Sequence, residues 1–153
     1  MSRLLAIDLG LRCGMALYDT GRLQWYRSTN FGSTARLKRA IPGIFRDAND
    51  PQFLVVEGGG RLMLPWRRHA ERAGTTIMET DALTWRKDLL LDRQQRNAAD
   101  AKETAIKMAS KAIDWAGAPS PTGPVRHDTA EAILLGLWAC HRVGMLDELP
   151  RLT

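Results

Sequence analysis

Two short apolar runs in this chain each end on an acidic residue. Asp8 follows Leu4-Leu5-Ala6-Ile7, and Glu57 follows Phe53-Leu54-Val55-Val56. Short continuous apolar runs with polar boundaries indicate strands that are buried on both faces of a sheet. A carboxylate at the end of a buried strand is costly unless an opposite charge pairs with it. A fold that gathers these strand ends therefore needs a counter-charge at the same place.

A second pair of acids begins the last apolar segment of the chain, 130–140. Asp128 and Glu131 are three residues apart, so one face of a helix presents both carboxylates. Acidic residues favour helix starts in any protein, and this pair alone indicates nothing more than a helix start. Together with Asp8 and Glu57, however, the pair favours a site for divalent metal ions with oxygen ligands.

Length and composition indicate one globular domain over 1–153. A chain of 153 residues, 44% of them hydrophobic and 25% charged, buries one core and is too short for two ordinary domains. No apolar run is long enough to span a bilayer, and Asp8 interrupts the only early apolar stretch, so we expect neither a signal peptide nor a membrane partner. Cys13 and Cys140 are too few for a disulfide scaffold, which favours buried thiols and a cytoplasmic location.

The net charge of +5 favours a polyanionic partner. The positions of the basic residues along the chain support this more strongly than the net charge itself. A single Lys or Arg more often belongs to a solvated helix face, but a basic group beside an acidic centre favours binding to a phosphate backbone. The basic residues crowd the middle of the chain: Arg61, Arg67, Arg68, Arg72, Arg86, Lys87, Arg93, Arg96, Lys102, Lys107 and Lys111.

The order of predicted elements indicates an α/β fold with a mixed five-stranded sheet flanked by helices. Three early antiparallel strands, the second and third joined by a tight hairpin turn at 19–21, precede two parallel ones that follow helical crossovers. We predict strands over 3–8, 14–19, 22–29, 52–57 and 75–79. We predict a first helix that is capped by Ser33 or Thr34 and that kinks or ends at Pro42-Gly43, and a second helix over 65–73. A third helix is capped by Thr80 or Asp81 and continues through Leu91. The last two span 98–116, with Trp115 on the apolar face, and 128–143, which ends before Gly144.

Three segments, in order, carry a resemblance to a known family. Ile7-Asp8-Leu9-Gly10-Leu11-Arg12-Cys13-Gly14, then Val55-Val56-Glu57, then Asp128-Thr129-Ala130-Glu131-Ala132 resemble RuvC-type Holliday junction resolvases of the ribonuclease H-like superfamily. The stretch from Glu79 to Lys102 is similar to the family segment that carries DNA-contacting basic residues. The resemblance spans nearly the whole chain and implies the ribonuclease H-like sheet.

The resemblance implies a catalytic tetrad that is also the metal site: Asp8, Glu57, Asp128 and Glu131. Asp8 would bridge two Mg²⁺ (or Mn²⁺) ions, Glu57 would hold one of them, and Asp128 with Glu131 the other. Two such ions, ~3.5–4 Å apart, activate a water and stabilise the leaving oxygen of a phosphodiester. The products would be a 5′ phosphate and a 3′ hydroxyl.

The resemblance also implies the partners. Arg86, Lys87 and Lys102 would contact the DNA strand near the cut, and Arg61, Arg67 and Arg68 are further candidates for DNA binding. His127 would help to position water or phosphate. A histidine of the loop without a function is an equal alternative. A homodimer would cut a four-way junction symmetrically, because a two-fold arrangement suits the pseudo-symmetry of that substrate.

The chain departs from the family pattern at three places. Leu9 stands where Pro is common, and Glu131 where Asp is more usual. Gly58-Gly59-Gly60 stands where the family often has an aromatic residue that stacks at the junction centre, and the nearest aromatic residue is Trp66. The resemblance therefore leaves open how this chain would open a junction.

Three other interpretations compete. Asp8-Leu9-Gly10 with Gly14 also resembles the phosphate loop of actin-like and sugar-kinase-like ATPases, but those proteins need two such domains. The second alternative is a junction-binding module without catalysis. The four acids disfavour it, because carboxylates beside phosphate groups do not help a protein that only binds DNA. Another ribonuclease H-like nuclease, acting on RNA–DNA hybrid, on branched DNA or in RNA processing, stays open, although the basic middle segment and the Asp128–Glu131 spacing favour the resolvase.

Overall fold

The core of the protein is a mixed sheet with its first strand in the middle. A computed structural model describes residues 2–89 and 98–152. The strands are β1 (Arg3–Asp8), β2 (Arg12–Asp19), β3 (Arg22–Asn30), β4 (Phe53–Glu57) and β5 (Thr76–Thr80), in the order β3-β2-β1-β4-β5. The first three are antiparallel, whereas β4 and β5 run parallel to β1. This confirms the predicted ribonuclease H-like sheet.

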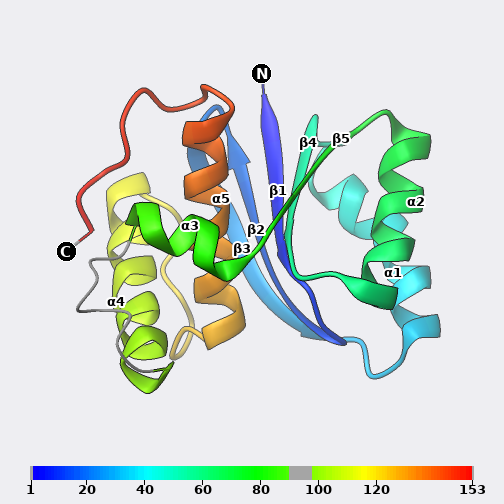
Figure 1. The fold of residues 1–153 in the computed structure, drawn as a ribbon, viewed down its shortest axis with the longest axis horizontal. Coiled ribbons are helices and arrows are strands. Elements are labelled where there is room, and N and C mark those ends of the chain that lie inside the picture. The colour runs from blue at the N-terminus through cyan, green and yellow to red at the C-terminus, as the bar shows by residue number, and fades with distance from the viewer. Residues whose placement is uncertain (1, 90–97, 153) are drawn as a thin grey trace.

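Helices cover both faces of the sheet (Figure 1). One face carries α1 (Thr34–Asp47), the 3-10 turn η1 (Gly60–Leu62) and α2 (Met63–Ala73); the other carries α3 (Ala82–Leu89), α4 (Ala98–Ala116) and α5 (His127–Arg142). Because successive strand residues point to opposite faces, Leu4 and Ala6 of β1 pack toward α5, and Leu5 and Ile7 pack toward α1 and α2. Every residue of α5 from 129 to 140 is buried, so this helix is part of the core.

Most element boundaries follow the local signals. Ser33 caps α1 with its hydroxyl, which accepts a hydrogen bond from the Arg36 N–H at 3.2 Å. Asp81 rather than Thr80 caps α3, because its carboxylate accepts the Thr84 N–H at 2.8 Å. In the predicted hairpin turn, Asp19 pairs with Arg22, and Thr20 and Gly21 have φ of 50° and 81°, as a two-residue type I′ turn requires. The predicted continuation of α3 through Leu91 lies outside the described residues.

Of the two alternatives predicted at Pro42-Gly43, a kink or an end, the helix does not take the end. Helix α1 continues past Pro42 to Asp47, because Leu37, Ile41, Ile44 and Phe45 form one buried stripe that offsets the single hydrogen bond lost at proline.

The prediction that Trp115 lies on the apolar face of α4 is wrong. Trp115 is 49% exposed, and Ala116 is buried in its place. With 3.6 residues per turn, the buried stripe of α4 moves from Ala112 to Ala116.

Two features expected from composition can be compared with the structure. Both cysteine thiols, Cys13 and Cys140, are buried and unpaired, as predicted. Among the helices described for 2–89 and 98–152, none has the length and apolar character needed to cross a bilayer.

Candidate active site

Asp8 and Glu57 lie side by side at one edge of the sheet. They are the last residues of the parallel neighbours β1 and β4 and are register partners. Burial and then the charge of Glu57 raise the pKa of Asp8 from 3.8 to about 8, with further contributions from Glu131 and Asp128. Burial and then the charge of Glu131 raise the pKa of Glu57 from 4.5 to about 7. Asp8 and Glu57 are thus close enough to the other two acids to feel their charge, which is electrostatically costly in the absence of a cation.

Gly14 allows the first turn of α5 to reach these acids. Gly14 of β2 is the register partner of Asp8. A β-carbon at this position would overlap the carbonyl group of Asp128 and would lie 2.8 Å from the Thr129 nitrogen. The missing side chain thus lets α5 begin directly against β2. Close approach of this helix brings Asp128 and Glu131 to the strand ends.

The Asp128 carboxylate is oriented by a residue of β3. Its Oδ2 accepts a hydrogen bond of 2.7 Å from the Ser28 hydroxyl, and Arg126 Nε lies 3.7 Å from its Oδ1. Ser28 is a functional candidate that sequence reasoning missed. No local signal marks it, because it lies 100 residues from Asp128 in the chain.

Glu131 is the most buried of the four acids, with 2% of its surface exposed. Its Oε1 accepts a hydrogen bond from the Arg86 guanidinium. His127 Nε2 lies 2.8 Å from the same oxygen but lacks hydrogen-bond alignment. The other oxygen, Oε2, is buried without a hydrogen-bond partner in the described protein. A buried carboxylate oxygen without a partner retains the capacity to bind a cation.

Helix α3 brings an indole and a guanidinium to the acids. Trp85 is fully buried and donates its Nε1–H to Glu57 Oε2 at 3.2 Å. The next residue, Arg86, lies beside the Trp85 ring and lowers the pKa values of both Asp8 and Glu57. Arg86 is thus an internal counter-cation of the cluster, whereas sequence reasoning assigned it to DNA. Trp85 was missed, although it stands directly before the basic pair Arg86-Lys87.

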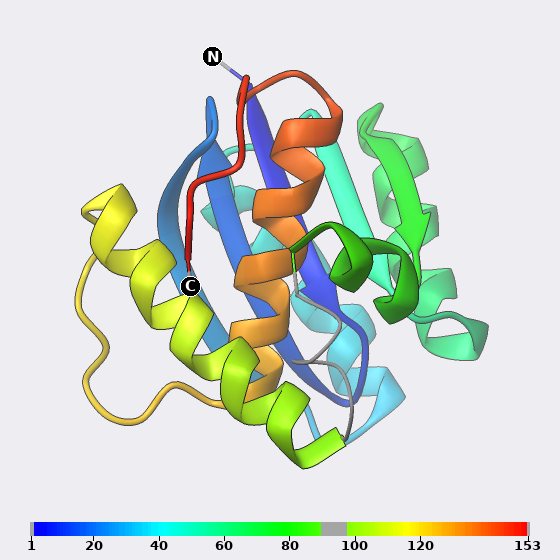
Figure 2. The same cartoon turned by 60° about the vertical axis from the view of Figure 1, so that its left-hand side comes forward.

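The other predicted DNA-binding residues lie at different parts of the surface. Lys87 is exposed on α3, and Lys102 is exposed near the start of α4, which begins at the same end of the molecule as α5 (Figure 2). Arg61 is exposed on η1, shortly after Glu57. Arg67 of α2 pairs with Glu79 of β5. Arg68 lies beside α1, on the face of the sheet opposite α5, and Arg93 and Arg96 fall outside the described residues.

The donor atoms of this cluster fit a hard divalent cation. Carboxylate oxygens are the ligands that Mg²⁺ and Mn²⁺ prefer, and Glu131 Oε2 has no hydrogen-bond partner among the described residues. Nevertheless, among the side chains described for 2–89 and 101–152, no three of Asp, Glu, His or Cys are gathered closely enough to hold an ion as they stand. Arg86 neutralises part of the charge instead. Binding of an ion at Glu131 Oε1 would require Arg86 to release that oxygen.

A mixed sheet in order 3-2-1-4-5 with helices on both faces is the fold of the ribonuclease H-like class. Within this class, the chain has the fold of the RuvC-type Holliday junction resolvases. RuvC of T. thermophilus in complex with a Holliday junction substrate aligns with a TM-score of 0.63 and 17% identity over 95% of this chain and 98% of RuvC. Ydc2, the yeast mitochondrial Holliday junction resolvase, aligns with a TM-score of 0.61 and 12% identity over 95% of this chain and 82% of Ydc2. At these identities the similarity establishes the fold.

Comparison of the sequence alone finds no matching family model and no matching curated protein.

The raised pKa values predict that the metal-free protein loses stability as the pH rises. The unfolded chain releases the protons of the Asp8 and Glu57 carboxyl groups near pH 4, whereas the folded state keeps them on Glu57 up to about pH 7 and on Asp8 up to about pH 8. The free energy of unfolding therefore falls as the pH rises from about 4 to about 8. We expect the Tm in EDTA to be lower by several degrees at pH 8.5 than at pH 5.5, since 1 kcal/mol corresponds to about 2–4 °C in a chain of this size. A Tm that rises over this range would contradict the account.

Arg86→Gln is expected to lower the free energy of unfolding of the metal-free protein by about 1–3 kcal/mol. The substitution leaves the buried Glu131 carboxylate without its cation, a loss that is moderated because the Arg86 side chain is 26% exposed. The exposed neighbour supplies a control: Lys87→Gln should change stability by less than about 0.5 kcal/mol. Urea unfolding in EDTA measures both, and equal values for the two variants would show that Arg86 does not neutralise the cluster.

Proposed function

We propose that this protein is a structure-selective endonuclease that resolves four-way DNA junctions by metal-dependent hydrolysis of phosphodiesters. The observation that carries the proposal is the convergence of four carboxylates at one end of a ribonuclease H-like sheet. The fold is shared with RuvC, whose solved structure contains a Holliday junction substrate. Buried acids that raise one another's pKa values lower the stability of the fold, so a purely structural or DNA-binding protein gains nothing from them. A metal-dependent nuclease uses such acids to bind its ions.

The four acids, Asp8, Glu57, Asp128 and Glu131, would hold two Mg²⁺ or Mn²⁺ ions. When bound, such ions lower the pKa of water and neutralise charge that develops on the phosphate oxygens. The protein's own contribution is orientation. The Trp85 indole fixes the Glu57 carboxylate, and the Ser28 hydroxyl fixes that of Asp128. Hydrogen bonds from the surrounding shell of this kind keep ligands in one orientation and raise affinity.

Arg86 would exchange its partner during the reaction cycle. In the absence of DNA it binds Glu131, and a guanidinium binds a phosphate group at least as well as a carboxylate because both accept paired hydrogen bonds. An arriving phosphate backbone would draw Arg86 away and leave Glu131 free for an ion. Lys87, Lys102 and Arg61 add positive charge for the arms of the junction. A homodimer would present two such sites and cut two strands with paired nicks.

A cleavage assay with several substrates tests the proposal. Labelled four-way junction, linear duplex, splayed arm and RNA–DNA hybrid are each incubated with the protein in Mg²⁺, Mn²⁺ or EDTA. We expect paired, symmetric nicks on the four-way junction alone, only with metal, and none with Asp8→Asn. If the RNA–DNA hybrid is cut as well as the four-way junction, the resolvase assignment is wrong and another ribonuclease H-like nuclease is favoured. Cutting that persists in EDTA would rule out the metal site.

A further inference from the structure

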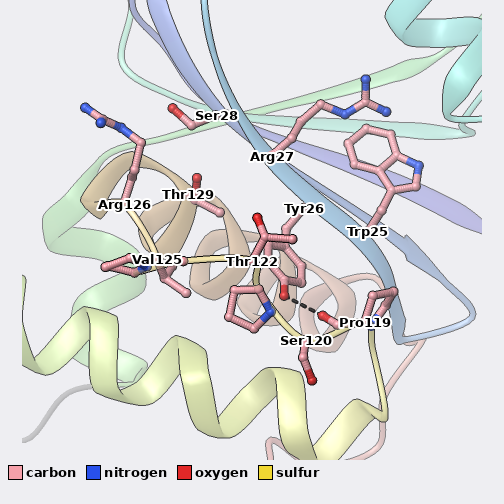
Figure 3. A pocket seen from close by; sticks show the side chains of 13 residues that line it. Trp25, Tyr26, Arg27, Ser28, Pro119, Ser120, Thr122, Val125, Arg126 and Thr129 are labelled. Carbon is pink, nitrogen blue, oxygen red and sulfur yellow. Dashed lines mark hydrogen bonds between the residues drawn. The ribbon is translucent and has the colours of Figure 1, made fainter.

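A pocket of about 320 Å³ opens beside the candidate active site, between β3 and the loop before α5. The Tyr26 side chain forms one wall, and the segment from Pro119 to Val125 forms the other (Figure 3). Trp25 lies at the rim, because its side chain leaves β3 on the opposite face and donates its Nε1–H to the Asp47 carbonyl at 3.4 Å. The Tyr26 hydroxyl donates a hydrogen bond to the Pro119 carbonyl and ties the two walls together. None of the predicted site residues lines this pocket.

The pocket begins where the acidic cluster ends. Three of its lining residues also surround Asp128: Ser28 donates to the Asp128 carboxylate at 2.7 Å, Arg126 lies 3.7 Å from it, and Thr129 is the next residue of α5. A ligand seated in the pocket is therefore separated from a metal-binding carboxylate by a single side chain. Consecutive nucleotides of one strand can therefore place one base in the pocket and a neighbouring phosphate beside Asp128.

The chemistry of the walls suits a nucleotide. Aromatic and proline rings provide flat apolar surface, on which a base of any identity stacks. Among the described residues the lining contains no Asp or Glu, and Arg126 brings positive charge to the end of the pocket that lies toward Asp128. The Arg27 guanidinium lies on the opposite face of β3, where it stacks over the Trp25 ring at 3.9 Å and pairs with Asp47 at 3.1 Å. β3 is the terminal strand of the described sheet, so one edge of its backbone has N–H and C=O groups free for the edge of a base.

We propose that this pocket binds one unstacked nucleotide of the DNA junction, adjacent to the phosphate that reaches Asp128. The inference rests on the proposed function and adds a substrate subsite to it. A volume of about 320 Å³ is at the lower end for small-ligand sites and matches one nucleotide rather than a duplex. The pocket also supplies aromatic surface that the chain lacks after Glu57, where Gly58 to Gly60 are exposed and Trp66 is completely buried.

Gly123 offers a way to fill the pocket without disturbing the fold. It lines the pocket, and a β-carbon placed on it meets no atom within 4 Å. Gly123→Trp should therefore occupy the space, while Gly123→Ala is the matched control that leaves it open. Tyr26→Leu is a second variant, which keeps apolar bulk and removes the stacking ring. Circular dichroism and the Tm establish that each variant is folded.

Junction binding in EDTA, where cutting is absent, provides the readout. Four-way junctions with a single abasic nucleotide, scanned through the positions next to the junction centre, are compared with the intact junction. For the wild type we expect one abasic position to weaken binding by about tenfold, as loss of one stacked base does. Gly123→Trp and Tyr26→Leu should weaken binding of the intact junction to a similar extent and be insensitive to that abasic position, whereas Gly123→Ala should behave as the wild type.

The outcomes separate this inference from the proposed function. If the wild type cuts junctions but no abasic position weakens its binding, or if Gly123→Trp binds the intact junction as the wild type does, the pocket is not a nucleotide site and the nuclease proposal stands. If the wild type neither binds nor cuts four-way junctions, both proposals are overturned.

Discussion

Replacing Asp8 by Asn is expected to reduce junction cleavage by about 10³-fold or more while leaving junction binding intact. Asp8 ends the central strand and is the acid that feels the charges of all three others. An amide is a much weaker ligand for Mg²⁺ than a carboxylate, and at the proposed metal site the loss of a direct ligand would cost more than the 10- to 100-fold typical of supporting residues. Binding survives because the substitution removes a charge that repels phosphate.

The same substitution should stabilise the metal-free protein, which distinguishes an active-site acid from a structural one. With the Asp8 charge removed, the Tm in EDTA at pH 8.5 should rise, and the decline of Tm between pH 5.5 and 8.5 should become shallower, because only Glu57 retains a raised pKa near neutrality. Asp147→Asn, at an exposed position, is the control and should change neither property. A less stable Asp8→Asn variant would indicate that the carboxylate makes favourable contacts in the fold and would contradict the metal-site interpretation.

Gly14→Ala is expected to lower the free energy of unfolding by at least about 3 kcal/mol and to abolish cleavage. The added methyl group meets the backbone of Asp128 and Thr129 rather than a flexible side chain. Overpacking typically costs about 1–3 kcal/mol, and more where backbone must move. Relief of the overlap requires α5 to shift away from β2, which carries Asp128 and Glu131 away from Asp8.

Gly59→Ala is the matched control for this prediction. Gly59 lies at the same end of the sheet, a β-carbon there meets nothing within 4 Å, and its φ of −169° is extended backbone that alanine adopts readily. We expect this variant to be as stable as the wild type or slightly more stable, because alanine restricts the unfolded chain. Thermal unfolding of the two variants, with junction cleavage at a temperature where both are folded, provides the measurement. If Gly14→Ala and Gly59→Ala behave alike, the approach of α5 to β2 does not position the acids.

Sheet topology was largely predictable because its signals are local. The apolar runs at 4–7 and 53–56 are short and unbroken, as is typical of strands buried on both faces, and each of the five predicted strands matches an observed strand within two residues at either end. The tight turn at 19–21 forced β2 and β3 into a hairpin, and the helix between β3 and β4 allowed β4 to run parallel to β1. The local signal at Pro42 left a kink or an end open for α1, and the helix continues because burial of its apolar stripe outweighs the local penalty of proline.

The sequence by itself determined that acids end β1 and β4 and begin α5, because each acid stands next to the apolar segment that it terminates or starts. Only the tertiary structure decided what those acids contact. Ser28 and Asp128, Trp85 and Glu57, and Arg86 and Glu131 are 100, 28 and 45 residues apart. The pocket likewise joins β3 to a loop some ninety residues later. Hydrogen bonds and ion pairs are satisfied by whichever groups packing brings within about 3 Å, and no periodicity along the chain records that choice.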